Sequence, residues 1–320
     1  MVLESKLMKR SEAVLLLGGA VAGASAPAFG QSLVTLKAGG VPEESATTAL
    51  YAEQGGIFRR YGLDVHLEVQ RSGTAVAAAV AGGAYQVGKS SIVPLIIAHA
   101  KGIPFVIVAP GGLYSAANPH IGLLVRADSP IKTAADMNGK TLGVSALEDL
   151  YTIGIKNWID KNGGNSSTLK IVELPLSAIQ GALEAGRIDA GGSTTPQLPE
   201  SLAGGKVRLL AWMFDSIAPL FMYTGWFSTL DYVKKNRKTI DEFARAMEQS
   251  AQYVNAHHQQ TIDMLSKYTG IEPSTIAHMT RATMGTSLDP KLLQPAIDVC
   301  AKYKVIPSAF NAREMLLGQT

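Results

Sequence analysis

The hydrophobic pattern alternates between two periods along the first two thirds of the chain. Short runs of β-branched and apolar residues predict strands, and stretches with apolar residues three or four apart predict helices. The predicted strands are residues 33–38, 63–69, 85–87, 105–109, 120–125, 141–144, 169–174 and 207–212. The predicted helices are residues 45–53, 74–81, 92–100, 133–137, 147–162 and 179–185. Strands that alternate with helices indicate a mostly parallel sheet.

An internal repeat is the most informative pattern. Residues 76–91, VAAAVAGGAYQVGKSS, align without a gap with residues 179–194, IQGALEAGRIDAGGST. The alignment pairs Gly83 with Gly186, Gly88 with Gly191, Ser90 with Ser193 and Ser91 with Thr194. Each copy follows a predicted strand and consists of a short helix, a glycine stop, a small buried strand and two hydroxyl residues. Such a repeat predicts two similar α/β lobes with a site in the crevice between them.

The fold class expected is α/β, with two lobes that are each a mostly parallel sheet flanked by helices. We expect lobe one over residues 31–121, lobe two over 122–222, and a return to lobe one with C-terminal helices over 223–320. Crossing strands at 120–125 and 220–226 would form the hinge. From residue 231 onward the pattern is helical, at 241–257, 259–268, 273–281 and 290–302. This helical tail is expected to pack on the outside of lobe one, because parallel strands need helical crossovers.

The N-terminus has the pattern of an export signal. Lys6, Lys9 and Arg10 precede an apolar stretch at 13–26, and Ala28-Phe29-Gly30 is a small-x-small cleavage site. This pattern predicts a signal peptide over residues 1–30 and a periplasmic mature protein. The single cysteine, Cys300, lies in a helical pattern and is expected in the core. Since no cysteine lies near the cleavage site, we expect no lipid anchor.

Composition narrows the function classes. The chain of 320 residues has a formal net charge of +3 and no basic cluster interleaved with aromatics, so we expect no nucleic-acid partner. None of the six histidines has metal-ligand spacing, and no nucleophile elbow, phosphate loop or dinucleotide fingerprint occurs. We therefore expect no metal, no cofactor and no catalysis, and a monomer.

Three segments carry a family resemblance: ALYAEQGGIFRRYGLDV at 49–65, VRADSPIKTAADMNGKTLGV at 125–144 and ALEAGRIDA at 182–190. With these motifs the chain resembles the periplasmic solute-binding proteins of ABC importers, in the branch for nitrate, sulfonates, taurine and thiamine precursors. The resemblance implies a type II periplasmic binding fold, a ligand held by strand-end loops between closing lobes, and an ABC permease as partner. Many relatives carry an acidic or aromatic residue where this chain has Thr195 before Pro196.

The site residues follow from a rule for open α/β sheets, in which ligands lie beyond the carboxyl ends of the strands. The rule selects Pro42, Ser90, Ser91, Tyr114 and Asn118 in lobe one, Ser145, Tyr151, Ser193, Thr194 and Thr195 in lobe two, and Phe214 in the return segment. Hydroxyls beside helix N-termini favour an anion, and the aromatic residues would form an apolar wall. The alternative is that the serines and threonines only cap helices.

These features predict a periplasmic binding protein that delivers a small organic anion, a sulfonate or an aromatic carboxylate, to an ABC permease. A thiamine-type pyrimidine precursor is the alternative ligand. Docking on a membrane receptor as a sensor is an alternative role. The family also includes the yeast-type pyrimidine synthase, but that enzyme carries a cysteine-rich motif, and this chain has no cysteine outside Cys300.

Overall fold

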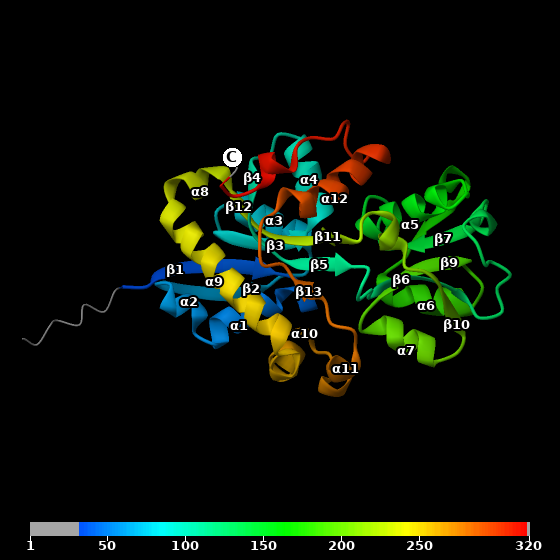
Figure 1. Ribbon diagram of the computed structural model, residues 1–320, viewed down its shortest axis with the longest axis horizontal. Helices are drawn as coiled ribbons and strands as arrows, with labels where there is room; N and C mark the ends of the chain where they lie inside the picture. Colours follow the sequence, from blue (N-terminus) through cyan, green and yellow to red (C-terminus); the bar gives the residue numbers. More distant parts are fainter. Residues whose placement is uncertain (1–31, 319–320) are drawn as a thin grey trace, which may run out of the picture. The chain divides into compact units, whose positions relative to one another are not determined.

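The computed structural model describes residues 32–318, whose strands form two five-stranded sheets and one three-stranded sheet (Figure 1). The signal peptide predicted at 1–30 lies outside the described residues. The first sheet has the order β2-β1-β3-β12-β4. Its strands are β1 Val34–Gly40, β2 Leu63–Val69, β3 Val87–Ser91, β4 Phe105–Pro110 and β12 Thr224–Thr229. Strands β1, β2 and β3 are parallel, and β12 runs antiparallel between β3 and β4.

The second sheet repeats this arrangement with the order β10-β6-β9-β7-β8. Its strands are β6 Ile121–Arg126, β7 Thr141–Val144, β8 Lys170–Glu173, β9 Ala190–Thr194 and β10 Val207–Ala211. Strands β7, β8 and β9 are parallel, and β6 is antiparallel to both β9 and β10. The α/β fold class, with helix-flanked sheets in two sequence-related halves, is confirmed.

The third sheet is where the chain crosses between the two larger sheets. It consists of β5 Gly112–Ser115 between β11 Leu220–Met222 and β13 Thr283–Met284. The prediction of a first crossing strand at 120–125 is therefore wrong, because that segment is an inner strand of the second sheet. The second crossing, predicted at 220–226, contains β11 but ends in β12 of the first sheet. Strands β5 and β11 pair antiparallel, so the two connections are hydrogen-bonded to each other.

Helices cover the faces of both large sheets. The helices are α1 Thr47–Gln54, α2 Ile57–Arg60, α3 Gly73–Ala81, α4 Ile92–Ala100, α5 Leu150–Lys161, α6 Leu176–Glu184, α7 Gln197–Ala203, α8 Leu230–Lys235, α9 Arg237–Ala256, α10 Ile262–Thr269, α11 Pro273–His278 and α12 Pro290–Lys302. Short 3-10 turns lie at η1 Glu44–Ala46, η2 Ala135–Met137, η3 Ser166–Thr168, η4 Met213–Ser216, η5 His258–Thr261 and η6 Ala312–Met315. The helix predicted at 147–162 begins only at Leu150, because Asp149 caps it by accepting a hydrogen bond from the Thr152 amide.

The repeat has a direct structural counterpart in the α3–β3 and α6–β9 units. Gly83 and Gly186 both adopt positive φ, at 76° and 67°, just after the helix of each copy. Since L-residues with side chains rarely adopt this conformation, both turns favour glycine.

The second pair of aligned glycines lets each strand pack closely against its helix. A Cβ on Gly88 would lie 2.5 Å from Val76, and one on Gly191 would lie 2.4 Å from Ile179, the residue aligned with Val76. Both copies therefore need glycine at this position for the same steric reason.

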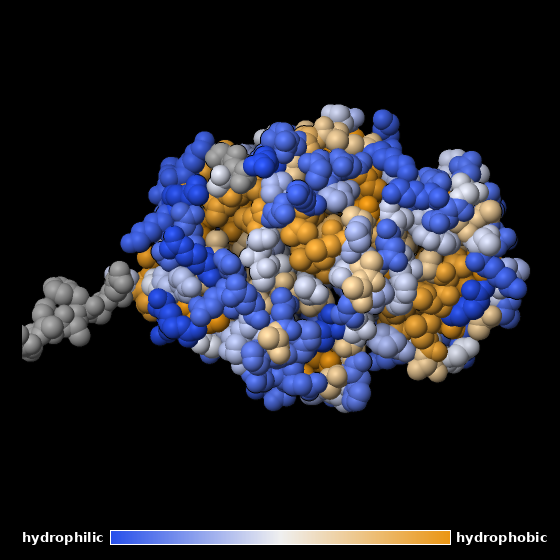
Figure 2. Space-filling view, in the orientation of Figure 1, coloured by the Kyte–Doolittle hydropathy of each residue, from blue (hydrophilic) through white to orange (hydrophobic). Residues whose placement is uncertain are grey.

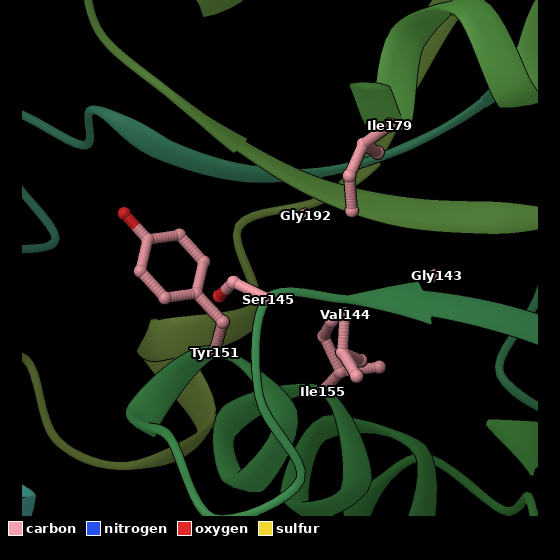
Figure 3. A pocket seen from close by; sticks show the side chains of 7 residues that line it. All are labelled: Gly143, Val144, Ser145, Tyr151, Ile155, Ile179 and Gly192. Carbon is pink, nitrogen blue, oxygen red and sulfur yellow. The ribbon is translucent and has the colours of Figure 1, made fainter. Parts of the chain in front are cut away.

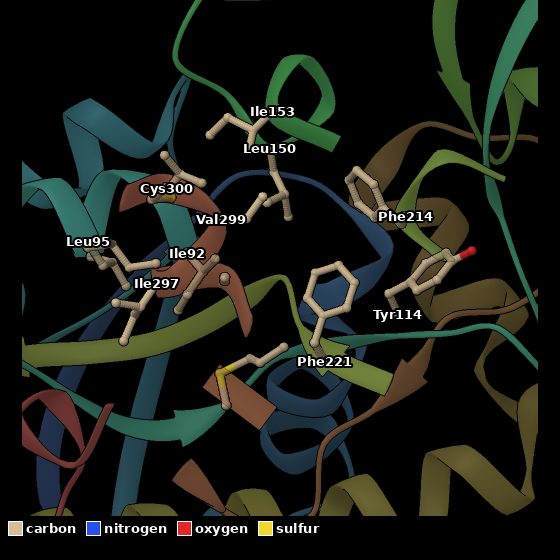
Figure 4. Close-up of a cluster of buried hydrophobic side chains, with 14 of the residues drawn as sticks. Ile92, Leu95, Tyr114, Leu150, Ile153, Phe214, Phe221, Ile297, Val299 and Cys300 are labelled. Atoms are coloured by element: carbon tan, nitrogen blue, oxygen red, sulfur yellow. The ribbon is translucent and has the colours of Figure 1, made fainter. Parts of the chain in front are cut away.

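The helical tail packs partly as predicted. Helix α9 covers the first sheet, with Ile240, Phe243 and Met247 in a core cluster that includes Leu36 and Trp226. Helix α12 differs from the expectation because its side chains also pack against the start of α5 in the second half. Figure 4 shows Ile297, Val299 and Cys300 of α12 in the same cluster as Leu150 and Ile153. Cys300 is buried as predicted, and burial raises the pKa of its thiol to about 12.

Figure 2 shows polar side chains over most of the visible face, with smaller apolar areas between them. Within the described residues, the exposed large hydrophobic side chains are Leu33, Val34, Val69, Ile103, Leu147, Val172 and Leu220. No helix in residues 32–318 is long and apolar enough to cross a membrane.

Candidate functional site

The carboxyl ends of the parallel strands gather the predicted site residues along one edge of each sheet. In the first sheet, β1 ends at Gly40 before the loop that contains Pro42, and β3 ends with Ser90 and Ser91. In the second sheet, the equivalent β9 ends with Ser193 and Thr194. The hydroxyl pairs were predicted to follow short strands, but they lie within β3 and β9. Pairing with β12 and with β6 extends these strands to include them.

Ser90 and Ser91 are not used as helix caps. Ser91 precedes α4 in an extended conformation, and its side chain makes no cap hydrogen bond. The Ser90 hydroxyl is buried and has no hydrogen-bond partner. It lies against the start of α3, where a Cβ on Gly73 would be 2.8 Å from Ser90 Oγ. The hydroxyl of Ser90 is therefore buried beside the N-terminus of α3 without a hydrogen bond within the protein.

The second sheet presents Ser145, Tyr151 and the β9 hydroxyls. Ser145 does not stand directly before α5, because three residues separate it from the capping Asp149, to which its hydroxyl donates a hydrogen bond. Thr194 Oγ1 donates to the carbonyl oxygen of His120 at 3.1 Å, and the Thr195 amide donates to the same oxygen at 3.2 Å. Ser193 is buried.

Tyr151 lines a small pocket at this edge (Figure 3). Its ring packs over Gly192, where a Cβ would be 3.1 Å from the ring, and the pocket also contains Gly143, Val144, Ser145, Ile155 and Ile179. Burial raises the pKa of the Tyr151 phenol, a hydrogen bond with Thr194 offsets part of this effect, and the charge of Glu43 adds to it. Glu43 belongs to the loop after β1 of the first sheet, whereas Tyr151 lies in α5 beside the second sheet.

Tyr114 and Phe214 were predicted to line the crevice between the lobes, but they lie inside the protein. Both side chains are fully buried, and their rings meet edge to face at 5.4 Å between centroids (Figure 4). The Tyr114 hydroxyl donates to Asp215 Oδ1 at 2.6 Å, and burial raises the pKa of this phenol. Tyr114 lies in the crossing strand β5 and Phe214 in η4, so both rings pack where the chain crosses between the two large sheets. Asn118 is exposed, and its amide donates to the Arg281 carbonyl at 3.1 Å.

Two further polar residues lie beside the predicted site residues: Lys89 and Tyr223. Lys89, next to Ser90, is buried, and its ammonium donates to Glu43 Oε2 at 2.8 Å and to Ser45 Oγ at 2.6 Å. Tyr223 lies between β11 and β12, and burial together with the charges of Glu44 and Glu43 and the nearby Tyr151 raises its pKa. The sequence signal for Lys89 was a lysine within a short buried strand. The pattern could not show to which side its side chain points.

His120 is buried at the start of β6, beside the crossing strands. Its ring lies 5.7 Å from the Tyr223 ring, and neither ring nitrogen has a hydrogen-bond partner. Burial lowers the pKa of His120 to about 4, and the nearby Asn118 backbone offsets only part of this effect. The imidazole is therefore neutral at physiological pH, and charging it opposes folding.

We expect acidification to destabilise the protein through His120. The unfolded state binds the proton near pH 6.5 and the folded state only near pH 4, so stability is present above pH 6.5 and is lost as pH falls through this window. The expected loss between pH 7 and pH 5 is about 2 kcal/mol. Urea denaturation at both pH values checks this. The His120→Phe variant should lose about 2 kcal/mol less than the wild type, while the exposed His278→Gln control should behave like the wild type. An equal loss in all three proteins would contradict the assignment.

Residues 44–261 match the sequence model of the family described as NMT1/THI5 like. The chain belongs to this family. A curated relative, the putative aliphatic sulfonates-binding protein of Escherichia coli (strain K12), is 22% identical over 246 residues, which is 74% of each protein.

Solved structures share the fold. The periplasmic aliphatic sulphonate binding protein of Escherichia coli superposes with a TM-score of 0.74 at 20% identity, over 89% of this chain and 92% of that one. The alkanesulfonate-binding protein of Xanthomonas axonopodis pv. citri bound to MOPS gives 0.70 at 17% identity, over 89% and 98%. The periplasmic nitrate-binding protein of Synechocystis PCC 6803 gives 0.60 at 14% identity, over 76% and 69%. The fold is thus that of periplasmic binding proteins.

Within residues 32–318, no group of three or more His, Cys, Asp or Glu side chains is arranged to hold a metal ion. The polar groups at the two edges are hydroxyls, phenols and one buried ammonium paired with a carboxylate. Such groups can orient and bind a small polar molecule through hydrogen bonds and charge.

Proposed function

We propose that this protein is the periplasmic substrate-binding component of an ABC importer. It captures a small organic anion, a sulfonate or an aromatic carboxylate, and delivers it to the permease. The observation that carries the proposal is the placement of Ser90 and Ser193 at the equivalent ends of β3 and β9, one in each of the two related sheets. The names of the sulfonate-binding relatives support the ligand class.

The two sheets define the parts that would close on the ligand. Lobe one comprises residues 31–121 together with the return segment 223–320, and lobe two comprises 122–222. Ser90 and Ser193 come from equivalent strand ends in the two lobes, and we propose that one ligand anion accepts hydrogen bonds from both. A ligand that contacts both edges stabilises the closed arrangement through its higher affinity for that state. No bond is made or broken in this mechanism, and the relatives described as binding proteins support a role without catalysis.

We infer a periplasmic location from the same relatives. The sulfonate- and nitrate-binding neighbours are described as periplasmic, which supports export of this chain by the predicted N-terminal signal. The binding protein would act as a monomer without a lipid anchor.

A thiamine-type pyrimidine is the second candidate ligand, because the family resemblance of the sequence includes binding proteins for thiamine precursors. The half-buried phenols of Tyr151 and Tyr223 could face a flat heterocycle as well as an organic anion.

A thermal-shift screen of the purified mature chain tests the proposal. The panel contains aliphatic sulfonates including MOPS, aromatic carboxylates, nitrate and aminopyrimidines, all at equal ionic strength. A ligand present at a hundred times its Kd should stabilise the protein by about 2.7 kcal/mol, which corresponds to a Tm increase on the order of 5 °C. A response to pyrimidines alone would favour the second candidate. No response to any compound would contradict both.

A further inference from the structure

The ammonium of Lys89 is a buried cation at the edge of the first sheet where the parallel strands β1 and β3 end. Lys89 precedes Ser90 in β3, and its side chain is only 1% exposed. Its Cβ would lie 3.7 Å from a Cβ placed on Gly40, the last residue of the parallel strand β1. The side chain thus points across the strand ends to the loop after β1, where Glu43 and Ser45 accept its hydrogen bonds.

The two charges of this pair are buried very differently. The Glu43 side chain is 53% exposed, while that of Lys89 is enclosed. Glu43 stands at the entrance of η1, where it makes no cap hydrogen bond. Its carboxylate can therefore turn into water, whereas the ammonium of Lys89 cannot. A buried charge without a partner costs several kcal/mol, so Lys89 needs an anion beside it in every state of the protein.

The Glu43 carboxylate lies where the two sheet edges and the C-terminal helices meet. Its charge contributes to the raised pKa values of Tyr151 in α5, Tyr223 after β11 and Tyr268 in α10, in each case after the larger effect of burial. The Tyr268 hydroxyl also lies 3.5 Å from the Val41 carbonyl in the same loop. The charge of Glu43 thus acts on phenols from three separate elements, and one of them, Tyr268, lies against the same loop.

A second acidic residue in the same turn serves as a contrast. Glu44 pairs with Arg281, and both side chains are largely buried, at 12% and 7% exposure. Neither partner can leave this pair for solvent. Among the ion pairs within residues 32–318, only Lys89–Glu43 combines a buried cation with a half-exposed carboxylate.

We infer that Lys89 is the anion-anchoring residue of the proposed site and that Glu43 is an internal counter-ion, which an anionic ligand replaces. Ligand binding exchanges one anion for another on Lys89 and releases Glu43 to solvent. Neutral molecules of the same shape are rejected because they would leave Lys89 unpaired. This inference rests on the proposed function, since it specifies how that site selects anions.

Chemical rescue of the Glu43→Gln variant tests the exchange without knowledge of the transported ligand. The probes are methanesulfonate and its neutral isostere dimethyl sulfone, added in low-salt buffer at neutral pH. The Tm of Glu43→Gln should be below that of the wild type and should be restored by millimolar methanesulfonate, but not by dimethyl sulfone. The double variant Glu43→Gln/Lys89→Met, which has no cation to pair, should not respond. Asp231→Asn removes the acidic partner of an exposed pair with Lys235 and controls for general anion effects.

Equal responses of the single and double variants to methanesulfonate, or equal rescue by both probes, would overturn the inference. If Glu43→Gln does not fold, Lys89→Met provides the second variant, because the half-exposed Glu43 needs no partner. Lys89→Met should bind the best anion from the screen at least a hundredfold more weakly than the wild type, and unchanged affinity would overturn the inference. If the thermal-shift screen identifies no ligand but methanesulfonate clearly rescues Glu43→Gln, the result would contradict the proposed function while supporting the exchange.

Discussion

The Arg281→Met substitution is expected to lower the free energy of unfolding by about 3–5 kcal/mol, because it leaves the buried Glu44 carboxylate without its cation. Arg281 Nε donates to Glu44 Oε1, and the other guanidinium nitrogens reach the His258 carbonyl at 3.3 Å and Thr261 Oγ1 at 3.2 Å. This one side chain joins the turn after β1 to the C-terminal helices.

The loss should depend on pH with a definite sign. Burial already raises the pKa of Glu44, and the attraction of Arg281 offsets only part of that effect. Without Arg281 the carboxyl would hold its proton to higher pH in the folded state than in the unfolded state. The folded state then binds more protons above pH 4.5, so stability falls as pH rises. We expect the variant to be closer to the wild type at pH 5 than at pH 8.

Guanidinium chloride denaturation at the two pH values measures this effect. The double variant Arg281→Met/Glu44→Leu should recover much of the stability, since it removes both charges together. Asp231→Asn, which breaks an exposed pair with Lys235, should change stability by less than about 1 kcal/mol. A loss for Arg281→Met as small as that of the surface control would contradict the importance of the buried pair.

Alanine at both Ser90 and Ser193 is expected to weaken ligand binding at least about a hundredfold. A hydrogen bond to a charged group contributes roughly 1.5–3 kcal/mol, and the double variant removes one from each lobe. The same change should not destabilise the ligand-free protein at Ser90, because its buried hydroxyl has no partner to lose. Reduced affinity without reduced stability is the signature of a hydroxyl kept for the ligand.

Calorimetry with the best compound from the screen and urea denaturation of the free protein measure the two quantities. Ser228 provides the matched control, because it is a buried serine in the neighbouring strand β12 whose hydroxyl donates to the Gln86 carbonyl at 2.6 Å. Ser228→Ala should lose about 1 kcal/mol of stability and keep its affinity. Unchanged affinity in the Ser90/Ser193 variant would remove both serines from the site.

Much of the architecture could be predicted because its causes are local. Gly83 and Gly186 terminate their helices in a conformation that favours glycine, and Gly88 and Gly191 allow strand and helix to touch. These requirements recur at equal spacing, so the repeat and the two related halves are visible in one sequence. The crossing strands were misplaced because β5 is only four residues long and forms through pairing with β11 and β13, which lie more than a hundred residues away.

Part of the candidate site could also be predicted, because the residues at the ends of the strands can be identified from the sequence. The amino-acid sequence by itself determined the twin α/β halves, the hydroxyl pairs at equivalent strand ends and the buried position of Cys300. Only the tertiary structure decided that Tyr114 and Phe214 pack inside, that Ser90 has no partner, and that Lys89 meets Glu43. Hydrophobic periodicity indicates which face of a helix or strand is buried. The direction of a polar side chain depends on partners that the fold brings from distant segments.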